Sequence, residues 1–341
     1  MGLKLEDIAR IAGVSKATAS LALNGSNMVK DQTREKIQKI ARENNYIPHS
    51  LARGLARKKS GIIGVIVPDI ESEYYGKLVH CLDEEIQRQG YSMVLAISND
   101  KPETERKNVE SFITQCVEGV IIAPINQQNH ELQYLEELDE NNISLVYVTA
   151  YYPKIERSCV MVDLEEGEYM LVQHLLSMGR KEILFLTGSH AILPSISRIK
   201  GYCRAFQERG MTVDQSNIVE CEKIDYQYAY HYIEEYMIQG KKMPDAIIAV
   251  NDMMALGVVN ALRAVGVNIP EQISVAGYDD ITYSKVSPIP ITTIYQDMGR
   301  MSLVAVNMLI EQINRGVRLT EKSWIDPEII IRESTVASIK S

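Results

Sequence analysis

The chain has 341 residues, of which 45% are hydrophobic and 24% are charged. These fractions are ordinary for a globular protein, and the length exceeds the usual span of one hydrophobic core, so we expect two or three domains. The N-terminus lacks the apolar segment of a secretory signal, and the sequence contains no run of about 18 apolar residues that could span a membrane. The five cysteines include no Cys-x-x-Cys pair. A cytoplasmic protein without membrane contact, disulfide framework or metal site is therefore predicted.

The net charge of −9 is unevenly distributed along the chain. Residues 1–60 contain 12 Lys and Arg against 5 Asp and Glu, a balance of +7, and the remainder has a balance of −16. Such asymmetry predicts a nucleic-acid-binding head on a body with a different role. Charge alone also fits a segment that binds acidic proteins or membranes, so the residue pattern has to decide.

Residues 1–46 show three short helical patterns separated by turn residues. Two helices joined by a turn that contains Gly form the helix-turn-helix unit, so this head is predicted to be a DNA-binding domain. A three-helix bundle without a ligand is the simpler alternative. The expected boundaries are Gly13 after the first helix, Ser15 as the cap of the second (16–24) and Asp31 as the cap of the third (33–45).

The second predicted helix has an outward stripe of small and polar side chains. It consists of Ala17, Ser20, Leu21 and Asn24, at i, i+3, i+4 and i+7 spacing, with Lys16 beside them. Such side chains allow a helix to enter the major groove and reach base edges and phosphates.

Residues 47–60 form a basic hinge between the head and the body. Pro48 permits a helix that begins near His49. It would carry an apolar strip and four basic side chains: Leu51, Ala52, Leu55 and Ala56, then Arg53, Arg57, Lys58 and Lys59. With about two turns it is shorter than the roughly 12–15 residues that an isolated helix needs, and Gly54 weakens it further. We predict a helix that orders against a polyanion; an ordinary basic linker fits equally well.

From residue 61 to residue 341, apolar runs alternate with amphipathic stretches. Near-continuous Val and Ile runs separated by helical patterns predict an α/β body with two doubly wound parallel subdomains. The expected strands are 61–69, 91–99, 119–124, 145–150, 159–163, 182–188, 217–222, 246–252, 273–280, 291–297 and 328–334. The expected helices are 75–89, 103–116, 130–141, 167–178, 198–210, 227–240, 252–265 and 297–315. We expect the N-subdomain to span about 61–161 and 293–320, and the C-subdomain about 162–292 and 321–341.

Two segments carry a family resemblance. LEDIARIAGVSKATASLALNG and VKDQTREKIQKIARENNYIPHSLARGLARKKSGIIGV resemble the head and hinge of the lactose-repressor/galactose-repressor family of bacterial transcription regulators. The body resembles type I periplasmic sugar-binding proteins over most of its length. Without that resemblance, composition would also fit a two-domain enzyme.

The resemblance implies a set of DNA contacts in the head and the hinge. Lys16, Ala17 and Leu21 fall on positions that contact bases, and Leu55 on a hinge leucine that wedges into the minor groove. The remaining implied contacts are Ser15, Asn24 and Thr33 on phosphates, with Thr18, Ser20, His49, Ala52, Arg53 and Ala56 beside them. Leu21 stands where several members have an arginine, and Ala17 where they have a longer polar residue. His49 stands where asparagine is frequent. The operator sequence of other members therefore cannot be assigned to this chain.

Polar and aromatic residues at predicted strand ends mark a ligand cleft, since parallel sheets bind ligands beyond the carboxyl ends of their strands. The candidates are Tyr74, Tyr75, Asp163, Arg198, Asn251, Asp279 and Gln296. Carboxylates, amides and one guanidinium with aromatic rings suit a polyhydroxylated ligand. The aspartates, including Asp252, could instead be helix caps, and the tyrosines could be packing residues. Thr149 and Ala150 stand where many relatives have an Asp-Arg pair, so the effector of a relative cannot be assigned to this chain by analogy.

Together these features predict a sequence-specific transcription regulator, a repressor as most of the family are, that binds a near-palindromic operator as a homodimer. A sugar or sugar derivative bound between the subdomains is expected to control its DNA affinity. Neither a catalytic residue nor a cofactor is expected, because GxGxxG, GxxxxGK[ST], GxSxG and HExxH motifs are missing from the sequence. A sugar-binding protein without a DNA role is the main alternative, and a two-domain enzyme is the third.

Overall fold

The computed structural model describes residues 3–23, 26, 28–44, 46, 60–127 and 131–336. The chain divides into two compact units, Met1–Gly61 and Ile62–Ser341, which are the head and the body. The predictions for Asn24 and for the hinge residues His49, Ala52, Arg53, Leu55 and Ala56 lie outside the described residues.

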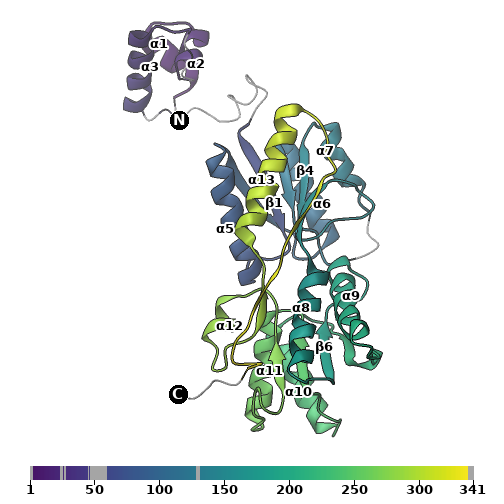
Figure 1. Cartoon of the computed structure of the whole chain (residues 1–341). Helices are drawn as coiled ribbons and strands as arrows, with labels where there is room; N and C mark the ends of the chain where they lie inside the picture. The colour runs from purple at the N-terminus through teal and green to yellow at the C-terminus, as the bar shows by residue number, and fades with distance from the viewer. Residues whose placement is uncertain are drawn as a thin grey trace. The chain divides into compact units, whose positions relative to one another are not determined.

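The head contains helices α1 (Leu5–Ala12), α2 (Lys16–Leu23) and α3 (Asp31–Glu43), which pack together as Figure 1 shows. Ile8, Ala19 and Ile37 are fully buried at their centre. Gly13 ends α1 with a φ of 71°, and Ser15 Oγ accepts the backbone N–H of Thr18 at 3.1 Å, as its capping role predicts.

The prediction that Asp31 caps the third helix was wrong. Asp31 is the first helical residue, Lys30 occupies the cap position, and the helix ends at Glu43. The Asp31 carboxylate pairs with Arg34 one turn later, and an acidic side chain in the first turn also interacts favourably with the helix dipole.

The N-terminal subdomain of the body is a parallel sheet in the order β11-β5-β4-β3-β1-β2. Its strands are β1 (Ile62–Val67), β2 (Ser92–Ile97), β3 (Gly119–Ile122), β4 (Ser144–Val148), β5 (Ser158–Val162) and β11 (Lys322–Ile325). Its helices are α5 (Glu73–Arg88), α6 (Pro102–Thr114), α7 (Glu136–Glu140) and α13 (Met298–Arg315), with a 3₁₀ turn η1 (Gln133–Leu135) before α7. Apolar cores on both faces bury the central strands, which explains their continuous Val and Ile runs.

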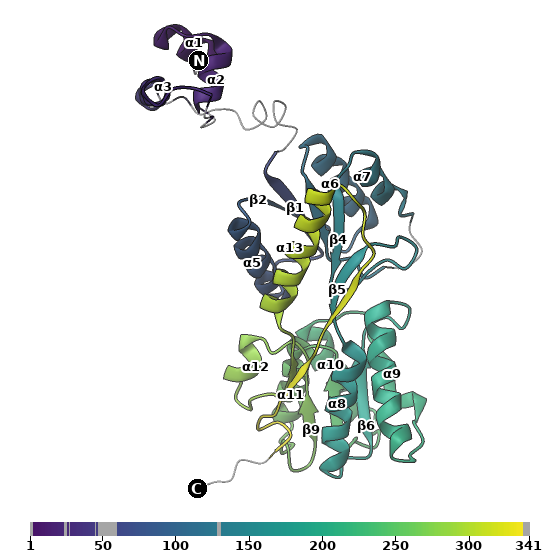
Figure 2. The same ribbon diagram turned by 45° about the horizontal axis from the view of Figure 1, so that its top comes forward.

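The C-terminal subdomain has a parallel sheet in the order β7-β6-β8-β9. Its strands are β6 (Ile183–Thr187), β7 (Ile218–Glu220), β8 (Ala246–Ala249) and β9 (Ser274–Ala276). Its helices are α8 (Leu164–Ser177), α9 (Leu193–Glu208), α10 (Tyr226–Ile238), α11 (Asp252–Ala264) and α12 (Thr282–Val286), with η2 (Gln215–Asn217) before β7. Figure 2 shows β4 and β5 in one subdomain and β6 and β9 in the other. The predicted fold class of two parallel α/β subdomains is confirmed.

The last crossings between the subdomains differ from the predicted boundaries. β10 (Thr293–Tyr295) pairs antiparallel with β12 (Glu328–Ile330), and its Tyr295 bridges to Asp279, so residues 293–295 belong to the C-terminal subdomain. β11 pairs with β5, so residues 322–325 belong to the N-terminal one. The sequence KSWI of β11 has exposed and more buried residues in alternation at a sheet edge, and it lacks the apolar run that predicts a buried strand. Among the described residues, no helix is long and apolar enough to cross a membrane.

Candidate functional site

The exposed face of α2 lies opposite its buried Ala19 and Ala22. Ser15, Lys16 and Ala17 are exposed, whereas Thr18, Ser20, Leu21 and, on α3, Thr33 are partly buried. Leu21 also packs against the core of the head. The predicted DNA-contacting residues that the structure describes therefore include three exposed residues at the start of α2, and Leu21 presents less surface than the predicted stripe implied.

Lys16 has an acidic neighbour in the head. Its Nζ lies 2.7 Å from Glu6 Oε1, and both side chains are well exposed. The hydrogen bond from Lys16, and then its charge, lower the pKa of Glu6. Exposed ion pairs contribute little to stability, so this contact does not hold Lys16 firmly in place.

A cleft of about 500 Å³ lies between the two subdomains of the body. Six of the seven predicted ligand residues line it: Tyr74 and Tyr75 from α5, Arg198 from α9, Asn251 before α11, Asp279 after β9 and Gln296 after β10. The carboxyl ends of the strands bring these residues together, as expected for parallel sheets.

Asp163 is the seventh candidate, and it does not line this cleft. Its Oδ1 accepts the backbone N–H of Glu166 at 2.9 Å and caps α8, which is the alternative that the sequence left open. It faces a neighbouring pocket that Arg204 and Trp324 also line.

The cap of α11 is Asn251, not Asp252 as the sequence suggested. Asn251 Oδ1 accepts the N–H of Met254 at 2.8 Å while the residue also lines the cleft. Asp252 is buried, and its carboxylate accepts Ile281 N–H and Thr293 Oγ1–H at 3.0 and 2.7 Å. It therefore holds the loop after β9, the loop that carries Asp279.

A chain of hydrogen bonds crosses the cleft. Tyr74 donates its hydroxyl to Gln296 Oε1 at 3.4 Å, and Gln296 Nε2 donates to Asp279 Oδ1 at 2.7 Å. Burial raises the pKa of Asp279 to about 7, against the opposing effects of the Arg198 charge and the Gln296 hydrogen bond. The Tyr74 and Tyr75 rings pack edge to face with centroids 5.1 Å apart.

Two residues that the sequence did not single out interact with Arg198, Tyr278 through its ring and Glu168 electrostatically. Its guanidinium carbon lies 4.2 Å from the centre of the Tyr278 ring. Glu168 of α8 is fully buried, and neither its carboxylate oxygens nor the Tyr278 hydroxyl has a hydrogen-bond partner among the described residues. Burial raises the pKa of Glu168 to about 8, although the Arg198 charge opposes this. In the run LEEGEYMLV, Glu168 resembles any polar helix residue, so only an unusually apolar helix face could have marked it.

Other cleft residues that were not predicted from the sequence come from loops. Asp100 has a φ of 53°, and its Oδ1 accepts the N–H of Asn126 at 2.9 Å, which joins two loops of the N-terminal subdomain. Among the described lining residues, Asp100, Glu222 and Asp279 are carboxylic acids and Arg198 is the cation. Their spacing along the chain follows no motif, so they could be found only from the fold.

The sequence comparisons assign the chain to a family. Residues 4–49 match the model for bacterial regulatory proteins of the lacI family, and residues 60–333 match periplasmic binding proteins and the sugar binding domain of the LacI family. The chain belongs to the LacI family of bacterial transcription regulators. This confirms the predicted family, and the chain is a DNA-binding transcription regulator with a helix-turn-helix head and a periplasmic-binding-protein-like body.

Relatives of this LacI-family chain are similar over almost their whole length. The HTH-type transcriptional repressor PurR of Haemophilus influenzae strain PittEE is 30% identical over 333 residues, which cover 97% of this chain and 98% of that protein. The HTH-type transcriptional regulator DegA of Bacillus subtilis strain 168 is 28% identical over 336 residues and 98% of both chains. These relatives are transcription regulators, in agreement with the expectation that the chain is not an enzyme.

Solved structures show the same fold. The lac repressor dimer bound to operator and the anti-inducer ONPF superposes with a TM-score of 0.85 at 24% identity, covering 99% of this chain and all of that one. A complex of the transcriptional regulator CelR with cellobiose gives a TM-score of 0.73 at 24% identity, covering 97% and 99%.

Proposed function

We propose that this LacI-family regulator is a repressor that binds a near-palindromic operator as a homodimer. A small polyhydroxylated molecule, a sugar or sugar derivative, binds the cleft of the body and changes the affinity for DNA. The observation that carries this proposal is the hydrogen-bonded chain from Tyr74 through Gln296 to Asp279, which spans the cleft beside Arg198.

The chemistry of the cleft supports a sugar. Gln296 and Asn251 offer amide donors and acceptors, Asp279 accepts, and Arg198 donates in a fixed plane. The Tyr74 and Tyr75 rings provide apolar surface next to these groups. The cellobiose complex of the CelR regulator shares the fold and so adds support for a carbohydrate ligand.

The ligand charge follows from the lining residues. Three carboxylic acids face one guanidinium across the described part of the cleft. A phosphorylated ligand would meet repulsion from this excess of negative charge, whereas a neutral sugar would not. The proposed effector is therefore an uncharged polyol or an amino sugar.

Coupling to DNA requires that the ligand prefer one arrangement of the two subdomains, because a ligand that binds both equally shifts nothing. The cleft residues are suited to this, since Tyr74 belongs to one subdomain and Asp279 to the other. Closure around a ligand would move the start of the body, to which the hinge is joined.

The residues proposed to contact DNA lie in the head and in the hinge. They are Ser15, Lys16, Ala17, Thr18, Ser20, Leu21, Asn24, Thr33, His49, Ala52, Arg53, Leu55 and Ala56.

A ligand screen tests the proposal. The full chain is heated with neutral sugars, amino sugars, sugar phosphates and nucleobases, and compounds that raise the melting temperature are titrated by calorimetry. Neutral or amino sugars are expected to bind, and Arg198→Ala to abolish their binding. If only nucleobases or sugar phosphates bind, the proposed ligand class is wrong.

A further inference from the structure

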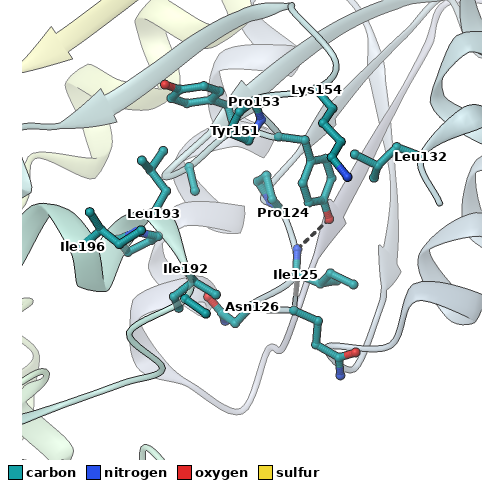
Figure 3. Close-up of a pocket in the computed structure, with 15 residues that line it drawn as sticks. Pro124, Ile125, Asn126, Leu132, Tyr151, Pro153, Lys154, Ile192, Leu193 and Ile196 are labelled. Atoms are coloured by element: carbon teal, nitrogen blue, oxygen red, sulfur yellow. Dashed lines mark hydrogen bonds between the residues drawn. The ribbon is translucent and has the colours of Figure 1, made fainter. Parts of the chain in front are cut away.

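A second pocket opens beside the cleft and has a different chemistry. This side pocket has a volume of about 280 Å³ and lies between the loops after β3 and β4 and the start of α9. Figure 3 shows Ile196 and Leu193 on one side of Pro124 and Leu132 on the other. Lys154 is the charged group among its described lining residues, so the side pocket lacks the carboxylates that characterise the cleft.

The two spaces are continuous. Pro124, Ala150, Ile192 and Pro194 line both the cleft and the side pocket. Helix α9 carries Ile196 into the side pocket and Arg198, two residues later, into the cleft. A ligand whose polar part reaches Arg198 could therefore extend an attached group past Pro194 towards Ile196.

The far wall of the side pocket is fixed by buried hydrogen bonds. The Tyr152 hydroxyl accepts the Ile125 N–H at 3.0 Å, the bond drawn in Figure 3, and donates to Glu105 at 2.9 Å. The Tyr134 hydroxyl donates to the same carboxylate at 2.5 Å. Glu105 is fully buried, so this group satisfies the polar ends of both tyrosines away from the pocket. Tyr152 and Ile125 thus present apolar surface held in a defined position.

The near wall is apolar but incompletely covered. Leu193, Pro194 and Ile196, all in the first turn of α9, remain partly exposed. Apolar surface left open next to a polar ligand site is typical of a subsite. The volume is sufficient for one aromatic ring or a short alkyl chain, since a cavity of roughly 150 Å³ can hold benzene.

We propose that the side pocket is an apolar subsite that binds an aryl or short alkyl group attached to the ligand in the cleft. This inference rests on the proposed function for the polar part of the ligand. It specifies the effector as a glycoside or similar conjugate with an apolar arm. Burial of each methylene group strengthens binding about fourfold, so a phenyl group should strengthen it at least tenfold over a methyl group.

The first test uses 4-fluorophenol as a probe and the full chain, with binding followed by fluorine NMR. Ile196→Asp places a charge in the side pocket, and Ile196→Trp fills it without adding charge. Both should weaken probe binding at least tenfold. Ile238→Asp is the matched control, because Ile238 is 84% exposed at the end of α10 and outside the pocket, and it should bind as the wild type does. Absence of probe binding by the wild type, or binding by both Ile196 variants as tight as that of the wild type, would overturn the proposal.

The second test compares methyl and phenyl glycosides of glucose, galactose and N-acetylglucosamine by calorimetry. A phenyl preference of at least tenfold that both Ile196 variants remove, and Ile238→Asp keeps, supports the subsite. Equal affinities of methyl and phenyl glycosides would refute the subsite and leave the sugar-binding cleft standing. If 4-fluorophenol binds at Ile196 while no glycoside of either kind binds, the sugar proposal fails and the apolar pocket remains.

Discussion

The Glu73 carboxylate accepts two hydrogen bonds from Thr282, at 2.8 Å from its backbone N–H and at 2.6 Å from its hydroxyl. Glu73 begins α5 in one subdomain, and Thr282 begins α12 in the other. The contact therefore joins the two walls of the cleft at its edge and favours the arrangement seen in this structure. A ligand that closes or opens the cleft must act with or against this contact.

Removing the latch formed by Glu73 and Thr282 should open the cleft. Glu73→Ala removes both hydrogen bonds, whereas Thr282→Ala removes the bond from the hydroxyl and keeps the one from the backbone N–H. One partly exposed hydrogen bond contributes about 1 kcal/mol, so Thr282→Ala should shift the ratio of the two arrangements about fivefold and Glu73→Ala should shift it further. Small-angle X-ray scattering is expected to show a larger radius of gyration for each variant. Thr114→Ala, which removes a threonine hydroxyl on α6 that bonds within its own helix, should leave it unchanged. A double variant that opens the molecule further than either single change would show that the two residues do not act through one contact.

Glu168 predicts a pH dependence of stability. Its pKa rises from an ordinary 4.5 to about 8 in the folded chain, so the folded state binds a proton more tightly than the unfolded state. The stability due to the protonated form is complete below about pH 4.5 and is lost as the pH rises through about 8. Glu168→Gln should therefore raise the melting temperature by several degrees at pH 9 and change it little at pH 4.5.

The control for this measurement is Glu166→Gln, on the same helix. Glu166 is substantially exposed and pairs with Arg204, so its replacement should give no gain in stability at high pH. A pH-independent effect of Glu168→Gln, or a gain that is largest at low pH, would contradict the assignment of a buried protonated carboxyl.

In the head, we expect DNA to compete with the Glu6 carboxylate for the ammonium group of Lys16. Lys16→Ala should weaken operator binding and reduce discrimination against base changes in the half-site, because a lysine in the major groove reads base edges. Glu6→Gln should strengthen operator binding slightly, since it removes the competing carboxylate. Binding to a set of operator variants, measured at fixed salt concentration, distinguishes a loss of specificity from a uniform loss. A uniform loss for Lys16→Ala would indicate a phosphate contact instead.

The hinge prediction can be tested with Leu55. If Leu55 wedges into a minor groove, Leu55→Ala should weaken operator binding by about tenfold to hundredfold while binding to random DNA changes little. The reason is that a wedge and the bend it causes occur only in the specific complex. Electrophoretic mobility shifts with operator and random duplexes provide the comparison. Equal weakening on both duplexes would exclude the wedge.

Sequence patterns predicted those features that depend on repetition or on local chemistry. Buried strands such as Ile62–Val67 are continuous apolar runs, and the cap at Ser15 depends on a neighbour three residues away. By contrast, β11 was missed because its partner strand β5 is distant in the sequence (Lys322 pairs with Cys159), and exposure at the sheet edge removed its apolar pattern.

Only part of the cleft was predicted from the sequence. Asn251 and Asp279 follow strands, where the fold class places ligands, and Arg198 lies in the second turn of α9. Asp163 has the same sequence context and is a cap, because a cap and a ligand residue look alike until the cleft walls are known. Glu168 and the side pocket arise from packing between α8, α9 and distant loops, for which the sequence has no local signal.

Control of operator binding through the cleft is tested most directly with Arg198. Operator affinity of the full chain is measured with and without a saturating amount of the sugar that calorimetry identifies, for the wild type and for Arg198→Ala. The sugar should change the operator dissociation constant of the wild type at least tenfold. Arg198→Ala should keep the ligand-free operator affinity and lose the response. An equal response in Arg198→Ala, or no response of the wild type to bound sugar, would contradict ligand control through this cleft.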